Sequence, residues 1–311
     1  MKFAMVFPGQ GSQSVGMLQA YAGLPGVAEV VAEAQKVLGR EFVELLDKGP
    51  AEALNLTLNT QPAMVTAGYA AYSAWRGLGG PQPEIVAGHS LGEYTALVAA
   101  DAIEFAQCLP LVRFRAQAMQ EAVPEGKGAM AAILNLDDEN VRIACEEAAQ
   151  GETVQAVNFN APGQVVIAGH KAAVARAMEV CKAKGAKRAL PLPVSAPFHS
   201  SLMQPAAERL RGYLEGVEVA APAVPLINNV DVETPRDPRA IKDALVRQAA
   251  SAVRWVETVR RMADMGVTHV VECGPGKILA GLVKRIAPQL QGIALADRAA
   301  LEQALAAVKG A

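Results

Sequence analysis

The chain has 311 residues, of which 51% are hydrophobic and 19% charged, so it can bury a sizeable core and does not have the composition of a disordered protein. A formal net charge of −2 excludes the strongly basic surface of nucleic-acid-binding proteins, and no apolar run is long enough to span a membrane. Four scattered cysteines and four histidines lack the spacing of a metal site or a disulfide framework. We therefore expect a cytoplasmic protein that binds no metal, nucleic acid or membrane.

The first elements predicted along the chain are a strand and two helices. Residues 3–7 form a short apolar run that ends at a proline, as a buried strand would. The glycine-rich loop that follows completes neither a dinucleotide-binding nor a P-loop motif, although Gln10 in it could aim its amide at a reacting oxygen. Apolar residues at helical spacing predict one helix over residues 27–48 and a second over 62–76 that begins at Pro62.

A strand-to-helix turn with a central serine comes next. Residues 85–87 are apolar and suit a buried strand, and helical spacing resumes at Leu91. Between them, Gly88-His89-Ser90-Leu91-Gly92 fits G-x-S-x-G, the motif in which a tight turn exposes the hydroxyl of a strained serine. The glycines leave room for the turn and for close approach of a substrate. We predict that Ser90 is a nucleophile at the amino end of a helix, where backbone N–H groups favour developing negative charge.

A helix predicted over residues 102–122 carries two arginines among apolar residues. Arg113 and Arg115 are two positions apart, so they point to different faces of the helix. One of them could therefore face a pocket while the other faces water.

Residues 126–198 change character and predict a separate subdomain. Strands are expected at 129–134, 154–159, 164–169 and 188–194, with helices at 137–149 and 170–184. Strand, helix, hairpin, helix and strand in this order are the split βαβ, ferredoxin-like arrangement. We therefore predict an α/β fold in two parts. Residues 1–125 and 199–311 form the larger, discontinuous α/β domain with a nucleophile elbow, and residues 126–198 form the inserted ferredoxin-like subdomain.

After the subdomain the pattern returns to that of the large domain. Helices are expected at 203–215 and at 240–261, the second broken near Ser251, and strands at 225–229 and 267–273. His199 follows a proline and an aromatic residue at the entry to the first of these helices.

The chemistry of a serine nucleophile sets what else the site must contain. A hydroxyl is a weak nucleophile at neutral pH, so it needs a base within hydrogen-bonding reach and donors for the tetrahedral oxyanion. His199 is the candidate base, and the backbone N–H of Leu91, next after the nucleophile, is the expected oxyanion donor. What orients His199 stays open at this stage. Asp137 or Asp138 would give a Ser-Asp-His order, although helix capping explains both.

Several blocks of the sequence together resemble one family. They are Phe7-Pro8-Gly9-Gln10-Gly11-Ser12-Gln13, Gly88-His89-Ser90-Leu91-Gly92-Glu93-Tyr94, Arg115 with Met119-Gln120, Asn158-Phe159-Asn160-Ala161-Pro162-Gly163-Gln164, Pro197-Phe198-His199 and Gly274-Pro275-Gly276. In this order they resemble the malonyl-CoA:acyl carrier protein transacylases of bacterial type II fatty acid synthesis, and the resemblance covers nearly the whole chain.

The resemblance implies a ping-pong acyltransferase with a malonyl-serine intermediate. Ser90 would attack the thioester of malonyl-CoA with His199 as base, and the phosphopantetheine thiol of holo acyl carrier protein would then take the malonyl group. The main-chain carbonyl of Gln248 would orient His199. Further roles are implied for five residues: Gln10 and Leu91 in the oxyanion hole, Arg115 on the malonyl carboxylate, and Asn160 and His89 in support of the site. The resemblance also implies that the larger domain is a hydrolase-like α/β core with a parallel sheet. It further implies a monomer with no permanently bound cofactor, since the CoA thioester is a substrate.

One departure from the family pattern concerns substrate choice. Many bacterial members carry serine before the histidine, whereas this chain has Phe198, whose ring would crowd a 2-methyl branch and so favour malonyl. Two other activities remain open: the same transfer in a polyketide pathway, and hydrolysis by an α/β-hydrolase esterase. The esterase would need a carboxylate placed for His199 and usually an HGGG-like oxyanion loop, which the sequence lacks.

Overall fold

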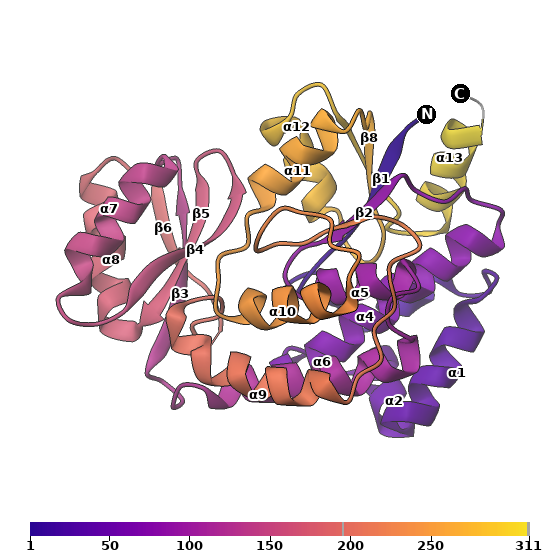
Figure 1. Ribbon diagram of the computed structural model, residues 1–311, viewed down its shortest axis with the longest axis horizontal. Helices are drawn as coiled ribbons and strands as arrows, with labels where there is room; N and C mark the ends of the chain where they lie inside the picture. The colour runs from indigo at the N-terminus through magenta and orange to yellow at the C-terminus, as the bar shows by residue number, and fades with distance from the viewer. Residues whose placement is uncertain (195, 310–311) are drawn as a thin grey trace.

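The protein contains two β-sheets, which lie in different parts of the molecule (Figure 1). The computed structural model describes residues 1–194 and 196–309, so the predicted end of the large domain at residue 311 lies outside the described residues. The larger sheet has five parallel strands in the order β7-β2-β1-β8-β9. These strands are β1 (Phe3–Phe7), β2 (Ile85–Gly88), β7 (Leu226–Ile227), β8 (His269–Glu272) and β9 (Gln291–Ala294).

Helices cover both faces of the parallel sheet because its central strands are apolar on both sides. Phe3, Met5 and Phe7 of β1 share one hydrophobic cluster with most helices of the large part, and Ala4 and Val6 share another with two more helices of the large part and with the core of the small one. The first group comprises α1 (Val27–Leu38), α2 (Arg40–Lys48), α3 (Ala51–Leu54), α4 (Thr57–Gly77), α5 (Gly92–Ala99), α6 (Phe105–Glu121), α9 (Gln204–Glu215), α10 (Pro238–Ala249) and α13 (Arg298–Lys309). The second comprises α11 (Trp255–Asp264) and α12 (Ile278–Ile286). The 3-10 turns η1 (Met17–Tyr21) and η2 (Ser201–Met203) complete the large part.

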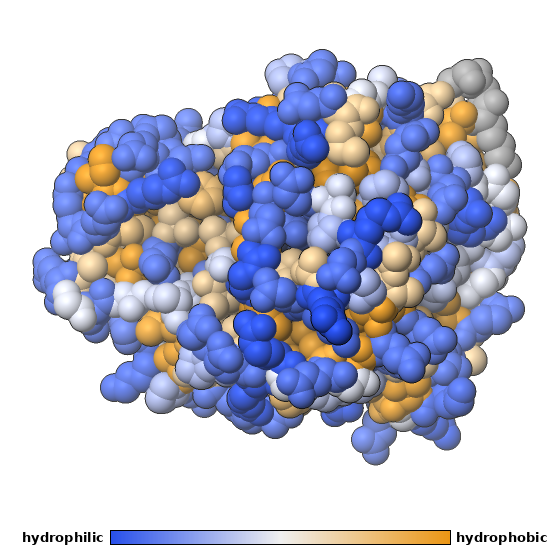
Figure 2. Space-filling view, viewed as in Figure 1, coloured by the Kyte–Doolittle hydropathy of each residue, from blue (hydrophilic) through white to orange (hydrophobic). Residues whose placement is uncertain are grey.

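The smaller sheet has four antiparallel strands in the order β4-β5-β3-β6 and forms the left lobe of Figure 1. Its elements are β3 (Gly128–Leu134), α7 (Asp138–Ala149), β4 (Val154–Ala161), β5 (Gln164–His170), α8 (Lys171–Ala183) and β6 (Arg188–Pro191). This is the split βαβ order, so the predicted fold class, a parallel α/β core with an inserted antiparallel subdomain, is confirmed. Figure 2 shows a mostly hydrophilic surface on this side, with hydrophobic residues in patches on both lobes.

The predicted bounds of two helices were wrong. The single helix expected over residues 27–48 is two helices, because Gly39 at φ 92° lies outside the helical region and turns the chain between α1 and α2. The second helix begins at Thr57, so Pro62 lies inside it. A proline near the amino end removes only one helical hydrogen bond, and the burial of most side chains of α4 outweighs that loss.

The strands were predicted with mixed success. Strand β9 was missed because Gln291–Ala294 is a partly exposed edge strand without an apolar run, and β6 ends at Pro191 instead of residue 194. The break expected near Ser251 is confirmed, since α10 ends at Ala249 and α11 begins at Trp255. In the part of the chain that the structure describes, no helix is both long and apolar enough to cross a membrane.

Candidate active site

The serine turn joins β2 to α5 at the carboxyl end of the parallel sheet. Ser90 has φ 51°, a left-handed conformation that costs about 1–3 kcal/mol in a residue other than glycine. A Cβ on Gly88 would lie 1.9 Å from the carbonyl carbon of Gly92, and a Cβ on Gly92 would lie 2.0 Å from the Phe7 carbonyl oxygen. The two glycines are therefore needed because β1, β2 and α5 pack backbone against backbone. The expectation that they leave room for the turn is confirmed, and close approach of a substrate stays a prediction.

Ser90 and His199 lie together although 109 positions separate them in the sequence. The Ser90 Oγ is 2.6 Å from His199 Nε2, and His199 Nδ1 is 2.9 Å from the main-chain oxygen of Gln248. Because a carbonyl only accepts, the proton of the neutral ring lies on Nδ1, and Nε2 is free to accept from the serine hydroxyl. Burial, and then the positive charge of Arg115, lower the pKa of His199 to about 3. The ring is therefore neutral at physiological pH, the form that a general base requires.

The group that orients His199 is a carbonyl, which resolves the alternative left open by the sequence. Asp137 caps α7 by accepting from the backbone N–H of Asn140 at 2.9 Å, and Asp138 is the first residue of the same helix. Both belong to the small subdomain, and the Nδ1 of His199 bonds to the Gln248 oxygen.

Arg115 lies beside this pair and is buried, with 2% of its surface exposed, whereas Arg113 on the same helix is exposed. The Nη1 of Arg115 donates to the side-chain oxygen of Gln61 at 2.8 Å, and the Nη2 of Arg115 donates to the side-chain oxygen of Gln248 at 3.0 Å. Nη2 also lies 3.4 Å from the Ser90 Oγ, and Nε has no hydrogen-bond partner among the described residues. The guanidinium is thus held rigidly beside the hydroxyl and keeps donor capacity for an anion.

The two residues expected to form the oxyanion hole both line the cavity above Ser90. The side chain of Gln10 is paired with Thr57, with Nε2 3.1 Å from the Thr57 Oγ1, so its amide is already engaged. Within residues 1–194 and 196–309, neither the Gln10 nor the Leu91 backbone N–H has a hydrogen-bond partner. The main chain of Gln10 is therefore the better source of a donor than its side chain.

The cavity has a volume of about 360 Å³ and is built by both parts of the molecule. The large part contributes Ser90 and Arg115, Phe198 lies at the junction of the two parts, and Asn160 enters from β4 of the small sheet. The Asn160 Oδ1 lies 2.8 Å from the Nε2 of His89, so the first residue of the serine turn contacts the opposite wall. The remaining lining residues are Gln10, Gln61, His89, Leu91, Met119, Met130, Ala132, Asn158, Gln164, Val166, Leu192, Val194, His199 and Ile278.

Three polar residues next to the site were not found from the sequence: Gln61, Glu93 and Asn229. All three are buried, and Glu93 Oε2 accepts from Gln248 Nε2 and from the backbone N–H of Asn229, each at 2.9 Å. Burial raises the pKa of Glu93 to about 7, against the lowering effect of the bond from Gln248. A signal was available, because Glu93 is an acid on a helix otherwise free of charge, and Asn229 follows a parallel strand at the edge where ligands bind.

Comparison with known proteins gives the family. The family model described as acyl transferase domain matches residues 4–300. The malonyl CoA-acyl carrier protein transacylase of Salmonella typhimurium is 55% identical over 305 residues, which cover 98% of this chain and 99% of the relative. The chain belongs to the malonyl-CoA:acyl carrier protein transacylase family.

Solved structures of malonyltransferases share the whole fold with this transacylase family member. The acyl-carrier-protein S-malonyltransferase of Burkholderia pseudomallei is 64% identical with a TM-score of 0.96, covering 98% of this chain and 99% of that one. A malonyl-transacylase solved in complex with a type II polyketide acyl carrier protein is 53% identical, also with a TM-score of 0.96, and the match covers 98% and 99% of the two chains. Among the residues described here, no group of three or more His, Cys, Asp or Glu side chains could hold a metal ion.

Proposed function

We propose that this protein transfers the malonyl group of malonyl-CoA to the phosphopantetheine thiol of acyl carrier protein, for fatty acid synthesis in the cytoplasm. The observation that carries the proposal is the placement of the buried Arg115 guanidinium 3.4 Å from the hydroxyl of a serine that is bonded to a neutral histidine. An acyl group bearing a carboxylate satisfies both sites at once, because its carbonyl carbon meets the serine while its charge meets the arginine.

In the first half-reaction the Ser90 Oγ attacks the thioester carbon and His199 Nε2 takes the hydroxyl proton. The Leu91 and Gln10 main-chain N–H groups stabilise the tetrahedral oxyanion. As the carbon–sulfur bond breaks, His199 returns its proton to the leaving CoA sulfur, and malonyl-Ser90 remains. The carbonyl of Gln248 holds the imidazole in the required tautomer throughout.

In the second half-reaction the pantetheine thiol enters the position that CoA has left. His199 takes the thiol proton, the sulfur attacks the ester carbon, and the carbon–oxygen bond to Ser90 breaks as Oγ regains the proton. This ping-pong sequence needs no cofactor, because one thioester is consumed and another thioester of similar energy is formed.

Two features of the cavity support selection of malonyl. Arg115 disfavours neutral acyl groups, because they leave a buried cation without a partner. Phe198 lines the same cavity, and a bulky ring there crowds a branched acyl group, although one methyl group is worth only about 1–3 kcal/mol. Asn160, whose oxygen contacts His89, is placed to support the substrate from the small sheet.

The orienting carbonyl also bears on the competing activities. An esterase of the α/β-hydrolase type requires a carboxylate at the position that the Gln248 carbonyl occupies, so the site supports acyl transfer better than ester hydrolysis. Transfer in a polyketide pathway uses the same chemistry, and the relative solved with a polyketide carrier protein is a reason to test both carriers.

We also propose where the carrier protein docks and how the chain is divided. Acyl carrier proteins are acidic, and six basic residues of the small subdomain and α12 are candidates for contact with one. Lys182 and Lys184 are paired with Glu179 and Glu147, whereas Lys187, Arg188, Lys284 and Arg285 form no ion pair within the described residues. The latter four are the better docking candidates. The domain boundaries at 125/126 and 198/199 are part of this proposal and agree with a small sheet confined to residues 128–191.

Intact-mass spectrometry after mixing the protein with malonyl-CoA tests the proposed function. We expect an adduct of malonyl mass that moves to holo acyl carrier protein, and its absence in Ser90→Ala. Ser201→Ala, at an exposed serine close to His199, is the matched control and should retain the adduct. An adduct that hydrolyses at the same rate with and without carrier protein would favour the esterase, and an adduct that persists in Ser90→Ala would refute the nucleophile.

A further inference from the structure

A buried asparagine outside every sequence motif holds the serine turn from behind. The Asn229 Oδ1 accepts from the backbone N–H of Ser90 at 2.7 Å, and its Nδ2 donates to the Gly88 carbonyl, also at 2.7 Å. One side-chain amide thus clamps the two ends of the tight turn, with no part of the residue exposed to solvent. Such bonds stabilise a left-handed serine that would otherwise relax.

The same contact determines which backbone donors are free for the reaction. Because the Ser90 N–H is occupied by Asn229, it cannot serve the oxyanion, and Leu91 supplies the only N–H of the pair that has no partner among the described residues. The Gly88 carbonyl is satisfied as well, so it does not compete for the hydroxyl of Ser90.

Asn229 is itself fixed by the loop that carries it. This loop, residues 228–233, follows β7, the strand that pairs with β2. The Asn228 Oδ1 accepts from the N–H groups of Asp231 and Val232 at 2.8 and 3.0 Å, which closes the loop on itself. The Asn229 N–H donates to the carboxylate of Glu93 on α5, so the loop is tied to the helix that follows Ser90.

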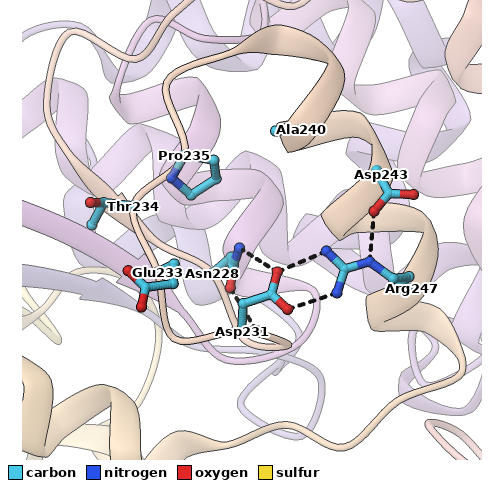
Figure 3. Close-up of a pocket in the computed structure, with 8 residues that line it drawn as sticks. All are labelled: Asn228, Asp231, Glu233, Thr234, Pro235, Ala240, Asp243 and Arg247. Carbon is cyan, nitrogen blue, oxygen red and sulfur yellow. Dashed lines mark hydrogen bonds and ion pairs between the residues drawn. The ribbon is translucent and has the colours of Figure 1, made fainter.

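An ion pair then connects this loop to the helix that orients the base. The carboxylate of Asp231 receives two bonds from Arg247, both of 2.7 Å, as Figure 3 shows. Arg247 lies on α10 immediately before Gln248, whose carbonyl binds His199. The loop that holds the nucleophile and the helix that holds the base are therefore joined by one bidentate pair.

We propose that Asn229 is a positioning residue for Ser90, and that the Asp231–Arg247 pair sets the separation between the serine and the His199-binding carbonyl. This inference rests on the proposed acyl transfer through Ser90. Neither Asn229 nor Asp231 lines the substrate cavity, so both act on the rate of acylation and not on the binding of malonyl-CoA.

The first test is Asn229→Ala, measured by quenched-flow acylation at several malonyl-CoA concentrations. We expect the maximal acylation rate to fall about 10- to 100-fold, as small displacements of a reacting group do, while the dissociation constant for malonyl-CoA stays the same. The labelling rate of Ser90 by a fluorophosphonate should fall in parallel, since this probe needs no malonyl pocket. A wild-type acylation rate in Asn229→Ala overturns the proposal.

The second test is rescue of Asn229→Asp by acid. An ionised carboxylate can accept from Ser90 N–H but repels the Gly88 carbonyl, whereas the protonated acid both accepts and donates as the amide does. Glu93 accepts from the Asn229 backbone N–H, and Arg115 and Asp231 act on Glu93 in turn. Since these groups and His199 also respond to pH, the activity of the variant is divided by that of the wild type at each pH. This ratio should rise as the pH falls from 8 to 5, and a constant ratio refutes the positioning role.

The ion pair has a matched control in Asp243, which bonds to Arg247 Nε at 2.6 Å but lies on the same helix as Arg247. Asp231→Ala should slow acylation, and Asp243→Ala should not, because only Asp231→Ala disconnects the loop at residues 228–233 from α10. Equal rates for the two variants would remove the pair from the proposal. Failure of the proposed function looks different, since the wild type would then form no malonyl adduct while the fluorophosphonate comparison would still report on Asn229.

Discussion

Replacing Arg115 by alanine gives the sharpest separation between binding of the malonyl carboxylate and general support of the site. The guanidinium is buried and has three donors directed at Gln61, Gln248 and the Ser90 hydroxyl, with Nε left over. Removing one partner of a buried ion pair costs about 3–5 kcal/mol. At 1.36 kcal/mol for each factor of ten, Arg115→Ala should lower kcat/KM for malonyl-CoA about 10²- to 10⁴-fold.

The same substitution should not impair transfer of a neutral acyl group. Acetyl-CoA leaves the wild-type cation unpaired, so its kcat/KM should be unchanged or higher in Arg115→Ala. Arg115→Lys keeps the charge but lacks the planar guanidinium, so its kcat/KM for malonyl-CoA should lie between those of the wild type and Arg115→Ala. Arg113→Ala, at an exposed position of the same helix, is the control and should alter neither substrate.

The assay is the rate of acyl-enzyme formation from each thioester, followed by intact mass, with the thermal midpoint of every variant recorded alongside. If Arg115 binds the malonyl carboxylate, the ratio of malonyl to acetyl transfer should drop by at least about 10². Equal losses of acylation rate for the two thioesters in a folded protein would show that Arg115 supports the structure of the site and does not bind the malonyl carboxylate.

Four further outcomes are expected. His199→Ala should lower the acylation rate about 10²- to 10⁴-fold, and a near-wild-type rate would exclude it as the base. Because burial and Arg115 depress the pKa of His199 to about 3, its imidazole resonances should not titrate between pH 8 and 5, and Arg115→Ala should raise that pKa. Charge reversal at Lys187 and Arg188 should raise KM for carrier protein but not for malonyl-CoA, and an unchanged KM would remove them from the interface. The pKa of Glu93 is raised to about 7 from 4.5, so the folded state holds this proton more tightly and the free energy of unfolding should decline as the pH rises from about 4.5 to 7. Relative to Glu93→Gln this decline should reach about 3 kcal/mol in urea unfolding, and an equal difference between the two proteins at pH 5 and pH 8 would contradict it.

The fold was predictable where apolar patterns are strong. The buried strand at residues 3–7, the serine turn and the split βαβ order all follow from local sequence, because short apolar runs and turn residues decide them. Helix bounds were less predictable. Gly39 separates two helices because of its positive φ, and Pro62 does not begin the second predicted helix, because burial against other segments extends that helix to Thr57.

Within the site, residues in continuous motifs were found and residues that meet only in space were not. Ser90 and Leu91 lie in one motif, His199 was the candidate base from its position at the entry to a helix, and the resemblance supplied Gln248. The side chain of Gln248 could not have been anticipated, because its contacts with Arg115, Glu93 and the Ser90 carbonyl come from three different elements. The left-handed conformation of His199, φ 66°, likewise has no local signature.

The two strained residues of the site depend on one short segment of the chain. Ser90 and His199 both adopt positive φ, at a cost of about 1–3 kcal/mol each, and such strain persists only where surrounding contacts over-determine it. For Ser90 these contacts come from Asn229 and Gln248, and for His199 the contact comes from Gln248 again. Residues 228–248 therefore hold both members of the pair, although only the carbonyl and side chain of Gln248 reach the reacting groups. Because the Ser90 Oγ and the His199 Nε2 must be held 2.6 Å apart on two left-handed residues, we expect substitutions in this segment to slow acylation even where the side chain does not touch the substrate.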